Sequence, residues 1–467
     1  MTSKTALHDL AATELLDLYR RKSLSPVEAT EAVLARIARW EPSLKATYAL
    51  DPEAALAAAR LSEERWRRGA PAGALDGVPV MIKENVATKG VPVPLGTAAT
   101  KLKAAADDAP PAARLREAGA IILGKTTMPD YGMLSSGLSS FHALTRNPWD
   151  LSKNPGGSSS GAGAAAAAGY GPLHLGTDIG GSVRLPACWC GLVALKPSFG
   201  RIPIDPPYVG RVAGPMTRIV DDAALMMGVL SKPDRRDGMS LPPNDINWKA
   251  LEKSPRKLRL GLMLNAGTGQ ALEKPVREVV VKAAKAFESA GAVLTEVDGI
   301  LTREMLDGLD NFWRARLWDD LEKLAPAERA KALPYIYKWG ERGAKLSGVE
   351  VIRGFNATMA IRSAAAKLFC DLDYVISPVS PVVKFPAEFA SPLNDPERPF
   401  EHICYTVPWN MAENPAVSIN GGYDDDGFPI GVQIVGRRFD DLGTLAMAKT
   451  FEGLRGPQRP WPSPPKR

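Results

Sequence analysis

The chain has 467 residues, of which 58 are Lys or Arg and 52 are Asp or Glu, so its formal net charge is only +6. No stripe of basic residues with interleaved aromatics accompanies this charge, and we therefore expect no nucleic-acid partner. A composition that is 45% hydrophobic and 24% charged excludes wholesale disorder, and a chain of this length can bury a large core.

The first 70 residues are typical of helices. Apolar residues between positions 7 and 19 fit a first amphipathic helix. Ser25 followed by Pro26 is a typical helix start, which predicts a second helix ending near Trp40. A third helix is expected over residues 52–66.

Beyond residue 70, short apolar runs alternate with helical ones. The strands that we expect lie at residues 77–82, 120–123, 173–176, 258–263, 292–297, 374–377, 416–419 and 430–435. Helices are expected between many of them, for example at residues 162–169 and 276–290. This alternation predicts an α/β fold, a sheet with helices on both faces. The proline-rich stretch 233–255 is expected to be a surface excursion, and the basic end of the chain a solvated extension.

The four cysteines argue against disulfide and metal chemistry. Cys188 and Cys190 form a C-x-C and the other two stand alone, which is neither a disulfide framework nor a paired zinc-ligand spacing. We interpret the pair as small core residues. Residues 1–10 lack the pattern of a signal peptide, and the low-charge run 155–179 is too rich in Gly, Ala and Ser for a membrane span. We therefore expect a cytoplasmic protein without a metal or a membrane partner.

The most unusual stretch runs from Asn154 to Pro197. GGSSSG at residues 156–161 precedes an Ala-rich helix, and TDIGGS at residues 177–182 follows a short strand. Small residues let backbone approach backbone or a ligand closely. Two such turns, each presenting serine, predict a site built mainly from main-chain N–H groups and hydroxyls.

A serine hydroxyl needs a base before it becomes a good nucleophile. None of the four histidines lies in a triad motif, and no G-x-S-x-G elbow is present, which disfavours an α/β-hydrolase triad. Lysine and carboxylate remain as bases. Lys83 follows the apolar run 78–82, where desolvation would lower its pKa and supply a neutral amine near pH 7.

Each of these residues also has a simpler interpretation. Ser158 is equally compatible with capping the Ala-rich helix that follows it. Lys83, taken alone, fits a surface lysine after a strand. We favour a structural ion pair for Asp178 and Arg184 over direct catalysis.

Longer motifs resemble the amidase signature family of serine hydrolases. They are GVPVMIKENV around Lys83, GKTTMPDYG, NPWD before GGSSSG, and TDIGGSVRLPACWCGLVALKPSFGR. The family's spacing is matched as well, because 75 residues separate Lys83 from Ser158 and 24 separate Ser158 from Ser182. AVSINGG and PIGVQIVG resemble its closing strands. The resemblance covers most of the chain and implies the amidase signature fold, with a central mixed, twisted β-sheet.

The resemblance implies a role for each motif residue. Ser182 would be the acylated nucleophile, Ser158 the bridging serine on a cis peptide bond, and Lys83 the base that accepts the proton through Ser158. The backbone N–H groups expected to form the oxyanion hole are those of Ile179, Gly180, Gly181 and Ser182. The residues expected to be structural at the site are Gly156, Gly157, Asp178 and Arg184. Those expected to contact the substrate are Met133, Leu134 and Ser135. No metal or organic cofactor is needed.

We expect a single domain over residues 1–467. Its parts would be an N-terminal helical region 1–70, a catalytic core 71–232, a variable and largely helical cover 233–370, a return to the core sheet 371–453, and a Pro/Arg-rich tail 454–467.

One competing motif is GAIILGKT at residues 119–126, which fits the P-loop expression. Its four variable residues form an apolar strand where a phosphate cradle needs an exposed loop, and Pro129 follows too closely for a helix. We therefore reject nucleotide binding and interpret Lys125 as structural.

The substrate stays open within the family. The aromatic-rich segment from Trp313 to Trp339 fits either core packing or a cover over the pocket. The stretch IPIDPPYVG at residues 202–210 differs from the sequence usual in the glutaminase branch. We expect a stand-alone amidohydrolase that uses water on small or aryl amides, anilides or carbamates (urethanes), with esterase side activity. The alternatives are the glutaminase (A) subunit of a tRNA-dependent amidotransferase and a non-catalytic binding subunit. The sequence is compatible with a homodimer.

Overall fold

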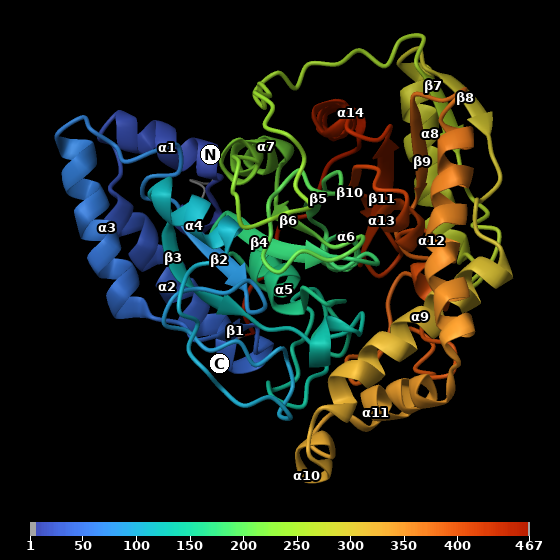
Figure 1. Ribbon diagram of the computed structural model, residues 1–467. Coiled ribbons are helices and arrows are strands. Elements are labelled where there is room, and N and C mark those ends of the chain that lie inside the picture. Colours follow the sequence, from blue (N-terminus) through green and yellow to red (C-terminus); the bar gives the residue numbers. More distant parts are fainter. Residues whose placement is uncertain (1–5, 466–467) are drawn as a thin grey trace.

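A mixed sheet of 11 strands lies at the centre of the computed structural model, which describes residues 6–465 (Figure 1). The strand order is β1-β3-β2-β4-β6-β5-β10-β11-β9-β7-β8. Strand β2 pairs in parallel with β3 and β4, and β7 pairs in parallel with β8 and β9. The pairs between these two groups are antiparallel. The predicted α/β fold with a mixed sheet is confirmed.

The strands are β1 Thr47–Tyr48, β2 Pro79–Lys83, β3 Ile121–Thr126, β4 Leu173–Asp178, β5 Val193–Lys196, β6 Val212–Thr217, β7 Arg259–Leu262, β8 Val293–Glu296, β9 Tyr374–Pro378, β10 Ala416–Tyr423 and β11 Pro429–Gly436. The α-helices are α1 Ala12–Arg20, α2 Pro26–Leu44, α3 Pro52–Arg67, α4 Pro110–Glu117, α5 Ser160–Ala168, α6 Arg184–Cys190, α7 Val220–Leu230, α8 Lys274–Ser289, α9 Arg303–Glu322, α10 Pro326–Arg329, α11 Pro334–Glu341, α12 Gly348–Leu368, α13 Val407–Met411 and α14 Asp441–Leu454.

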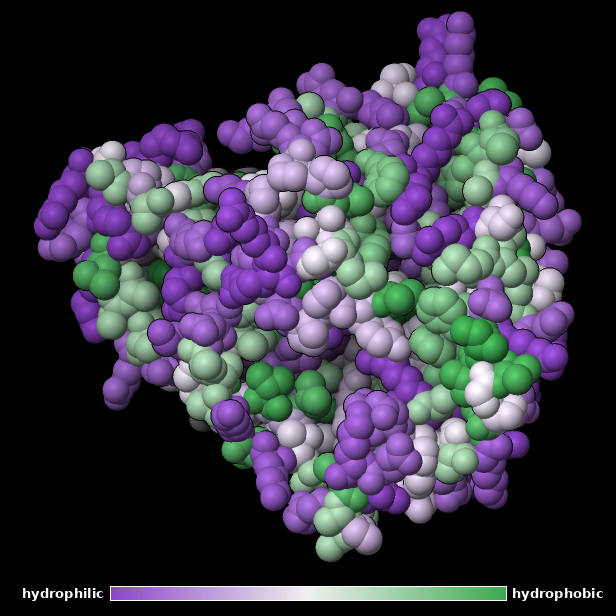
Figure 2. All heavy atoms as spheres, viewed as in Figure 1, coloured by the Kyte–Doolittle hydropathy of each residue, from purple (hydrophilic) through white to green (hydrophobic). Residues whose placement is uncertain are grey.

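Helices cover both faces of the sheet. Apolar residues of α4, α7, α8 and α14 share one large core with the central strands. On the other face, α2, α3 and α5 pack over β2 and β3, and α12 and α13 pack over β9 to β11. Figure 2 shows polar side chains over most of the visible face, with an apolar patch where α12 lies. The exposed large apolar residues of α12 are Val349, Ile352 and Met359.

The predicted helix starts have clear local causes. The Ser25 hydroxyl accepts a hydrogen bond from the Glu28 N–H at 3.2 Å, and the Glu28 carboxylate accepts one from the Ser25 N–H at 2.8 Å. This reciprocal capping begins α2, which ends at Leu44, a little beyond the predicted end. The prediction of a single helix from residue 7 to residue 19 is wrong. Leu7–Asp9 form a separate 3-10 helix, and α1 begins only at Ala12. The N–H of Ala12 donates to the Asp222 carboxylate of α7 at 2.9 Å, a cap that local sequence does not reveal.

Strands β5 and β6 were not predicted. β6 contains Gly214 and Pro215, which usually interrupt strands. Gly214 is required there, because a Cβ atom would lie 2.1 Å from the carbonyl oxygen of Leu195 in β5. Close approach of two backbones therefore explains a strand that the local pattern disfavours.

The two irregular segments differ in outcome. The stretch 233–255 holds no helix or strand and crosses the top of Figure 1 between α7 and β7, as predicted. The prediction that the tail is purely solvated is wrong in part, because two of its residues contact the rest of the protein. The guanidinium of Arg218 lies 4.3 Å from the ring centroid of Trp461, and Arg36 donates to the carbonyl of Pro462 at 2.6 Å. The outermost parts of the predicted regions, residues 1–5 and 466–467, lie outside the described residues. The division of the chain into five regions stays a prediction.

Candidate active site

Three segments meet at one edge of the sheet. Lys83 is the last residue of β2, and Thr177 and Asp178 end the neighbouring parallel strand β4. Because β2 and β4 are parallel, their carboxyl ends lie at the same edge. The third segment is the loop before α5, in which the peptide bond between Gly157 and Ser158 is cis.

The Lys83 amine is fully buried and contacts two hydroxyls. Its Nζ donates to Ser158 Oγ at 2.7 Å and to Thr177 Oγ1 at 3.0 Å. Asn85 Nδ2 donates to the same Thr177 hydroxyl at 3.0 Å. The surface-lysine interpretation is therefore wrong, since the exposed fraction of Lys83 is 0%.

Burial also changes the chemistry of this lysine. Burial lowers the pKa of Lys83 to about 7, and the positive charge of Arg211 acts in the same direction. The negative charges of Asp178 and Glu84 oppose the change but do not reverse it. A large fraction of Lys83 is consequently neutral near pH 7, as the sequence predicted.

Ser158 does not cap the following helix. Helix α5 begins at Ser160 with Ser159 as its N-cap residue, so the capping interpretation of Ser158 is wrong. The Ser159 N–H donates to the Ser182 carbonyl at 3.2 Å and ties the two serine-bearing turns together. Ser182 is half-buried. No hydrogen bond joins the Ser158 and Ser182 hydroxyls in the described part of the chain.

The predicted oxyanion donors divide into two groups. The Gly181 N–H donates to Asp178 Oδ1 at 2.8 Å, and the Val183 N–H donates to Asp178 Oδ2 at 3.2 Å. Gly181 is therefore occupied as a donor, which corrects its expected role. Its φ of +128° and its closeness to Thr406, whose hydroxyl would lie 2.6 Å from a Cβ atom, explain why glycine is needed. Ile179, Gly180 and Ser182 remain as candidate donors.

Asp178 and Arg184 form the ion pair that we expected. Arg184 Nε and Nη2 each lie 3.0 Å from an Asp178 oxygen, and both side chains are fully buried. Arg184 also donates to Thr406 O at 2.9 Å, Gln433 Oε1 at 2.8 Å and Asn410 Oδ1 at 2.6 Å. Burial by itself would raise the pKa of Asp178, but the charge and hydrogen bonds of Arg184, together with Asn410 and Lys196, outweigh burial and hold this pKa well below its usual range. The pair thus fixes the turn that carries Ser182.

A narrow cavity of about 40 Å³ opens beside Ser182. Its lining residues are Gly132, Met133, Leu134, Ser135, Ile179, Gly180, Ser182, Trp313, Pro399, Phe400, His402, Ile403 and Val407. All three predicted pocket residues, Met133 to Ser135, therefore lie close to Ser182. Of the aromatic segment, Trp313 lines the cavity and Trp339 packs behind Phe400, with ring centroids 5.5 Å apart.

The rejected P-loop motif is a strand in the structure. Residues 121–126 form β3, and Lys125 is buried within it. Its amine donates to the Thr88 hydroxyl at 2.7 Å and to the Val86 carbonyl. Lys125 is structural, as predicted.

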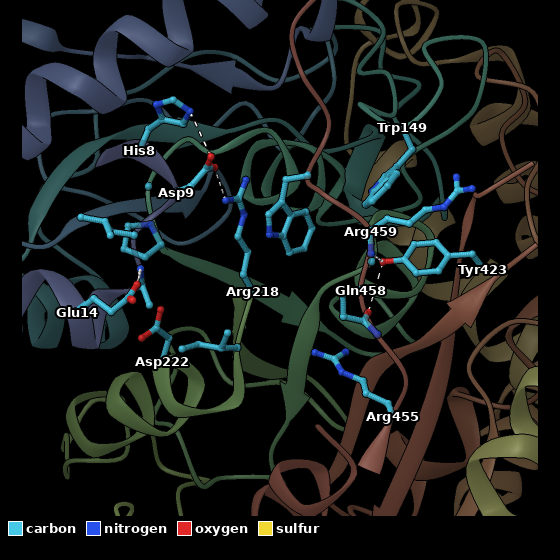
Figure 3. Close-up of a pocket in the computed structure, with 17 residues that line it drawn as sticks. His8, Asp9, Glu14, Trp149, Arg218, Asp222, Tyr423, Arg455, Gln458 and Arg459 are labelled. Carbon is cyan, nitrogen blue, oxygen red and sulfur yellow. Dashed lines mark hydrogen bonds and ion pairs between the residues drawn. The ribbon is translucent and has the colours of Figure 1, made fainter. Parts of the chain in front are cut away.

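A larger cavity of about 390 Å³ lies at the other end of β4, where Gly171 and Pro172 precede the strand (Figure 3). Figure 3 shows Arg218 directed toward Asp9, with which it forms an ion pair at 2.6 Å. Because Ser182 follows β4, this cavity is separate from the one beside the serine.

Comparison with known proteins shows which family the chain resembles. The Amidase family model matches residues 28–445. The chain is 34% identical to an acylamidase of Rhodococcus erythropolis, over 97% of this chain and 96% of that protein. It is also 34% identical to the (A) subunit of the glutamyl-tRNA(Gln) amidotransferase of Chloroflexus aggregans, over 96% of this chain and 97% of that protein. A solved bacterial aryl acylamidase of the amidase signature family aligns with a TM-score of 0.89 and 29% identity, covering 96% of this chain and 97% of that one.

This fold and these relatives define a hydrolase of amide carbon–nitrogen bonds. The chain belongs to the amidase signature family. Among residues 6–465, no helix combines the length and the hydrophobicity that a membrane span requires.

Proposed function

We propose that this protein is a stand-alone amidohydrolase that cleaves uncharged amides, anilides or carbamates through a serine acyl-enzyme. The observation that carries the proposal is the buried Lys83 amine, 2.7 Å from Ser158 Oγ, at the turn tied to Ser182. A neutral amine in this position is a suitable base for a chain of two hydroxyls.

The proposed reaction uses the Lys83–Ser158 contact and adds a proton transfer between the Ser182 and Ser158 hydroxyls. Ser182 Oγ attacks the carbonyl carbon, its proton passes to Ser158, and Ser158 passes its own proton to Lys83. The N–H groups of Ile179, Gly180 and Ser182 stabilise the oxyanion. The same hydroxyl relay then returns a proton to the departing amine, and water hydrolyses the acyl-enzyme. Esters carry a better leaving group, so the enzyme also has esterase activity.

The cavity beside Ser182 favours uncharged substrates. None of its lining side chains is a Lys, Arg, Asp or Glu. Free glutamine carries an α-ammonium and an α-carboxylate, and burying such charges without partners is strongly unfavourable. This argues for an acylamidase-like activity over a glutaminase, although the identity to relatives of both names is 34%.

A substrate panel tests the proposal. Aliphatic amides, anilides, carbamates and glutamine are compared with wild-type protein and the Ser182→Ala variant, alongside labelling by a fluorophosphonate. We expect turnover of uncharged amides and labelling in wild type only. If glutamine were the single substrate turned over, and if its turnover required the other amidotransferase components, the glutaminase function would be identified instead. Failure of folded wild-type protein to label would favour a non-catalytic binding role.

We further propose that the chain acts as one domain in a reducing compartment such as the cytoplasm. All four cysteines are free, and three of them are buried. The sequence is compatible with a homodimer, and this oligomeric state stays a prediction.

A further inference from the structure

A tryptophan forms part of the wall of the cavity beside Ser182. Trp313 belongs to α9, and only 4% of its surface is exposed. Its side chain is the largest among the described residues that line this cavity. The volume of the cavity therefore depends on where the Trp313 ring lies and on how firmly it is held there.

Other aromatic rings hold Trp313 in place. Its ring meets that of Phe400 edge-on, with centroids 5.9 Å apart, and that of Phe312 in the same way at 5.3 Å. Trp339 packs against Phe400 in turn, and its indole N–H donates to Asp310 Oδ1 at 2.8 Å. A wall packed this closely yields little to an oversized group, because side chains would have to leave their preferred rotamers.

The space that this wall leaves is small. The cavity beside Ser182 has a volume of about 40 Å³. Because one water-sized group needs about 10–15 Å³ of such a volume, the cavity holds roughly three non-hydrogen atoms. A short aliphatic group fits this space, whereas a chain of six or more carbons does not.

The position of the proton relay indicates which part of the substrate enters. In the proposed reaction the departing amine receives its proton from the Ser158 hydroxyl, so the amine has to lie beside Ser158. Among residues 6–465, neither Ser158 nor Lys83 lines the cavity, whereas Ser182 and the candidate oxyanion donors Ile179 and Gly180 do. The acyl part, which stays on Ser182, is therefore the part that extends into it.

We infer that Trp313 is a specificity-determining residue that limits the acyl part of the substrate to a short chain, about the size of an acetyl or propanoyl group. This inference rests on the proposed function, because it takes Ser182 to carry the acyl group. It narrows the substrate class to amides and anilides of short carboxylic acids and places no such limit on the amine part.

A series of anilides that share one amine tests the inference. Their acyl parts are acetyl, propanoyl, hexanoyl and octanoyl. Wild type should have its highest kcat/KM with acetyl or propanoyl, and a value about 10- to 100-fold lower with hexanoyl, as overfilling a packed site allows. Trp313→Ala enlarges the cavity and should reduce this preference for short chains by at least about 10-fold.

Trp318→Ala is the matched control. It removes the same side chain from the same helix, at a partly buried position where the Arg329 guanidinium lies 5.0 Å from the ring centroid and which does not line the cavity. This variant should keep the wild-type preference. A second series, with acetyl fixed and the amine lengthened, should respond equally in wild type and in Trp313→Ala.

Labelling by a fluorophosphonate with short alkyl groups reports on Ser182 separately. Normal labelling would overturn the role of Trp313 alone if wild type preferred long acyl parts, if Trp313→Ala kept the wild-type preference, or if it changed the amine series instead. Should Trp313→Ala fail to fold, Trp313→Phe decides, since it should weaken the preference in the same direction by a smaller factor. Failure of folded wild-type protein to label would overturn the proposed function as well.

Discussion

Replacing Lys83 with methionine tests the proposed base most directly. The substitution keeps an unbranched side chain of similar length and removes the amine. Burial lowers the pKa of Lys83 from 10.5 to about 7, which at about 1.4 kcal/mol per pKa unit is roughly 5 kcal/mol against the ammonium form. Below pH 7 the amine is protonated and accepts no proton. The wild-type kcat/KM should therefore rise with pH through about 7 and level off above it.

A second buried lysine supplies the control. Burial also lowers the pKa of Lys125 to about 7, so this residue would give a pH dependence in the same range if it acted in catalysis. Lys125 pairs with Ile82 in the parallel ladder, and therefore points to the face of the sheet opposite to Lys83. The Lys125→Met variant should keep the rising limb of the pH profile.

The assay is kcat/KM for one uncharged amide from about pH 5 to about pH 9, with thermal unfolding of each variant as the test of folding. Lys83→Met should lower kcat/KM by about 10²–10⁴-fold and lose the rising limb. The reasoning would be refuted by a folded Lys83→Met variant that keeps the limb, or by a Lys125→Met variant that loses it.

Three further outcomes are expected. Arg184→Met leaves a buried carboxylate without its partner and should cost about 3–5 kcal/mol of unfolding free energy; an unchanged denaturant midpoint would contradict the role of the ion pair. Gly157→Ala places a Cβ atom 2.5 Å from a backbone nitrogen and should abolish fluorophosphonate labelling, whereas Gly453→Ala, with no heavy atom within 4 Å, should label normally. Thr177→Val removes a hydroxyl that accepts from the Lys83 amine, and should lower the apparent pKa of the pH profile by about one unit; a profile that moves upward would argue against this contact.

Local pattern was a good guide to helices and a poor one to sheet pairing. Helix α3 runs over Pro52–Arg67, within one residue of its predicted span. Strand β6 escaped prediction because Gly214 and Pro215 break the local pattern, while pairing with β4 and β5 stabilises it. Pairing depends on distant segments, so the strand order was not predictable from local periodicity.

The residues of the candidate site also differ in whether local sequence predicts them. Lys83, Ser158 and Ser182 stand in motifs, and the resemblance of these motifs to the amidase signature family, not residue type alone, led to the roles that we propose for them. Asn410 and Gln433 reach Arg184 from more than 200 residues away, and no local pattern links them to it. The sequence assigns no role to His402, because the lack of hydrogen-bond partners for its ring within residues 6–465 is a property of the folded core.

The position of β10 and β11 has a consequence for how the chain is made. These strands are the last of the sheet to leave the ribosome, yet β10 pairs with β5 and β11 pairs with β9 in its middle. Until this hairpin is synthesised, β5 and β9 lack a neighbour that they have in the complete sheet, so any sheet that forms earlier would expose these two edges. Such edges pair readily with other chains, so a growing chain is vulnerable to aggregation until nearly its whole length has emerged.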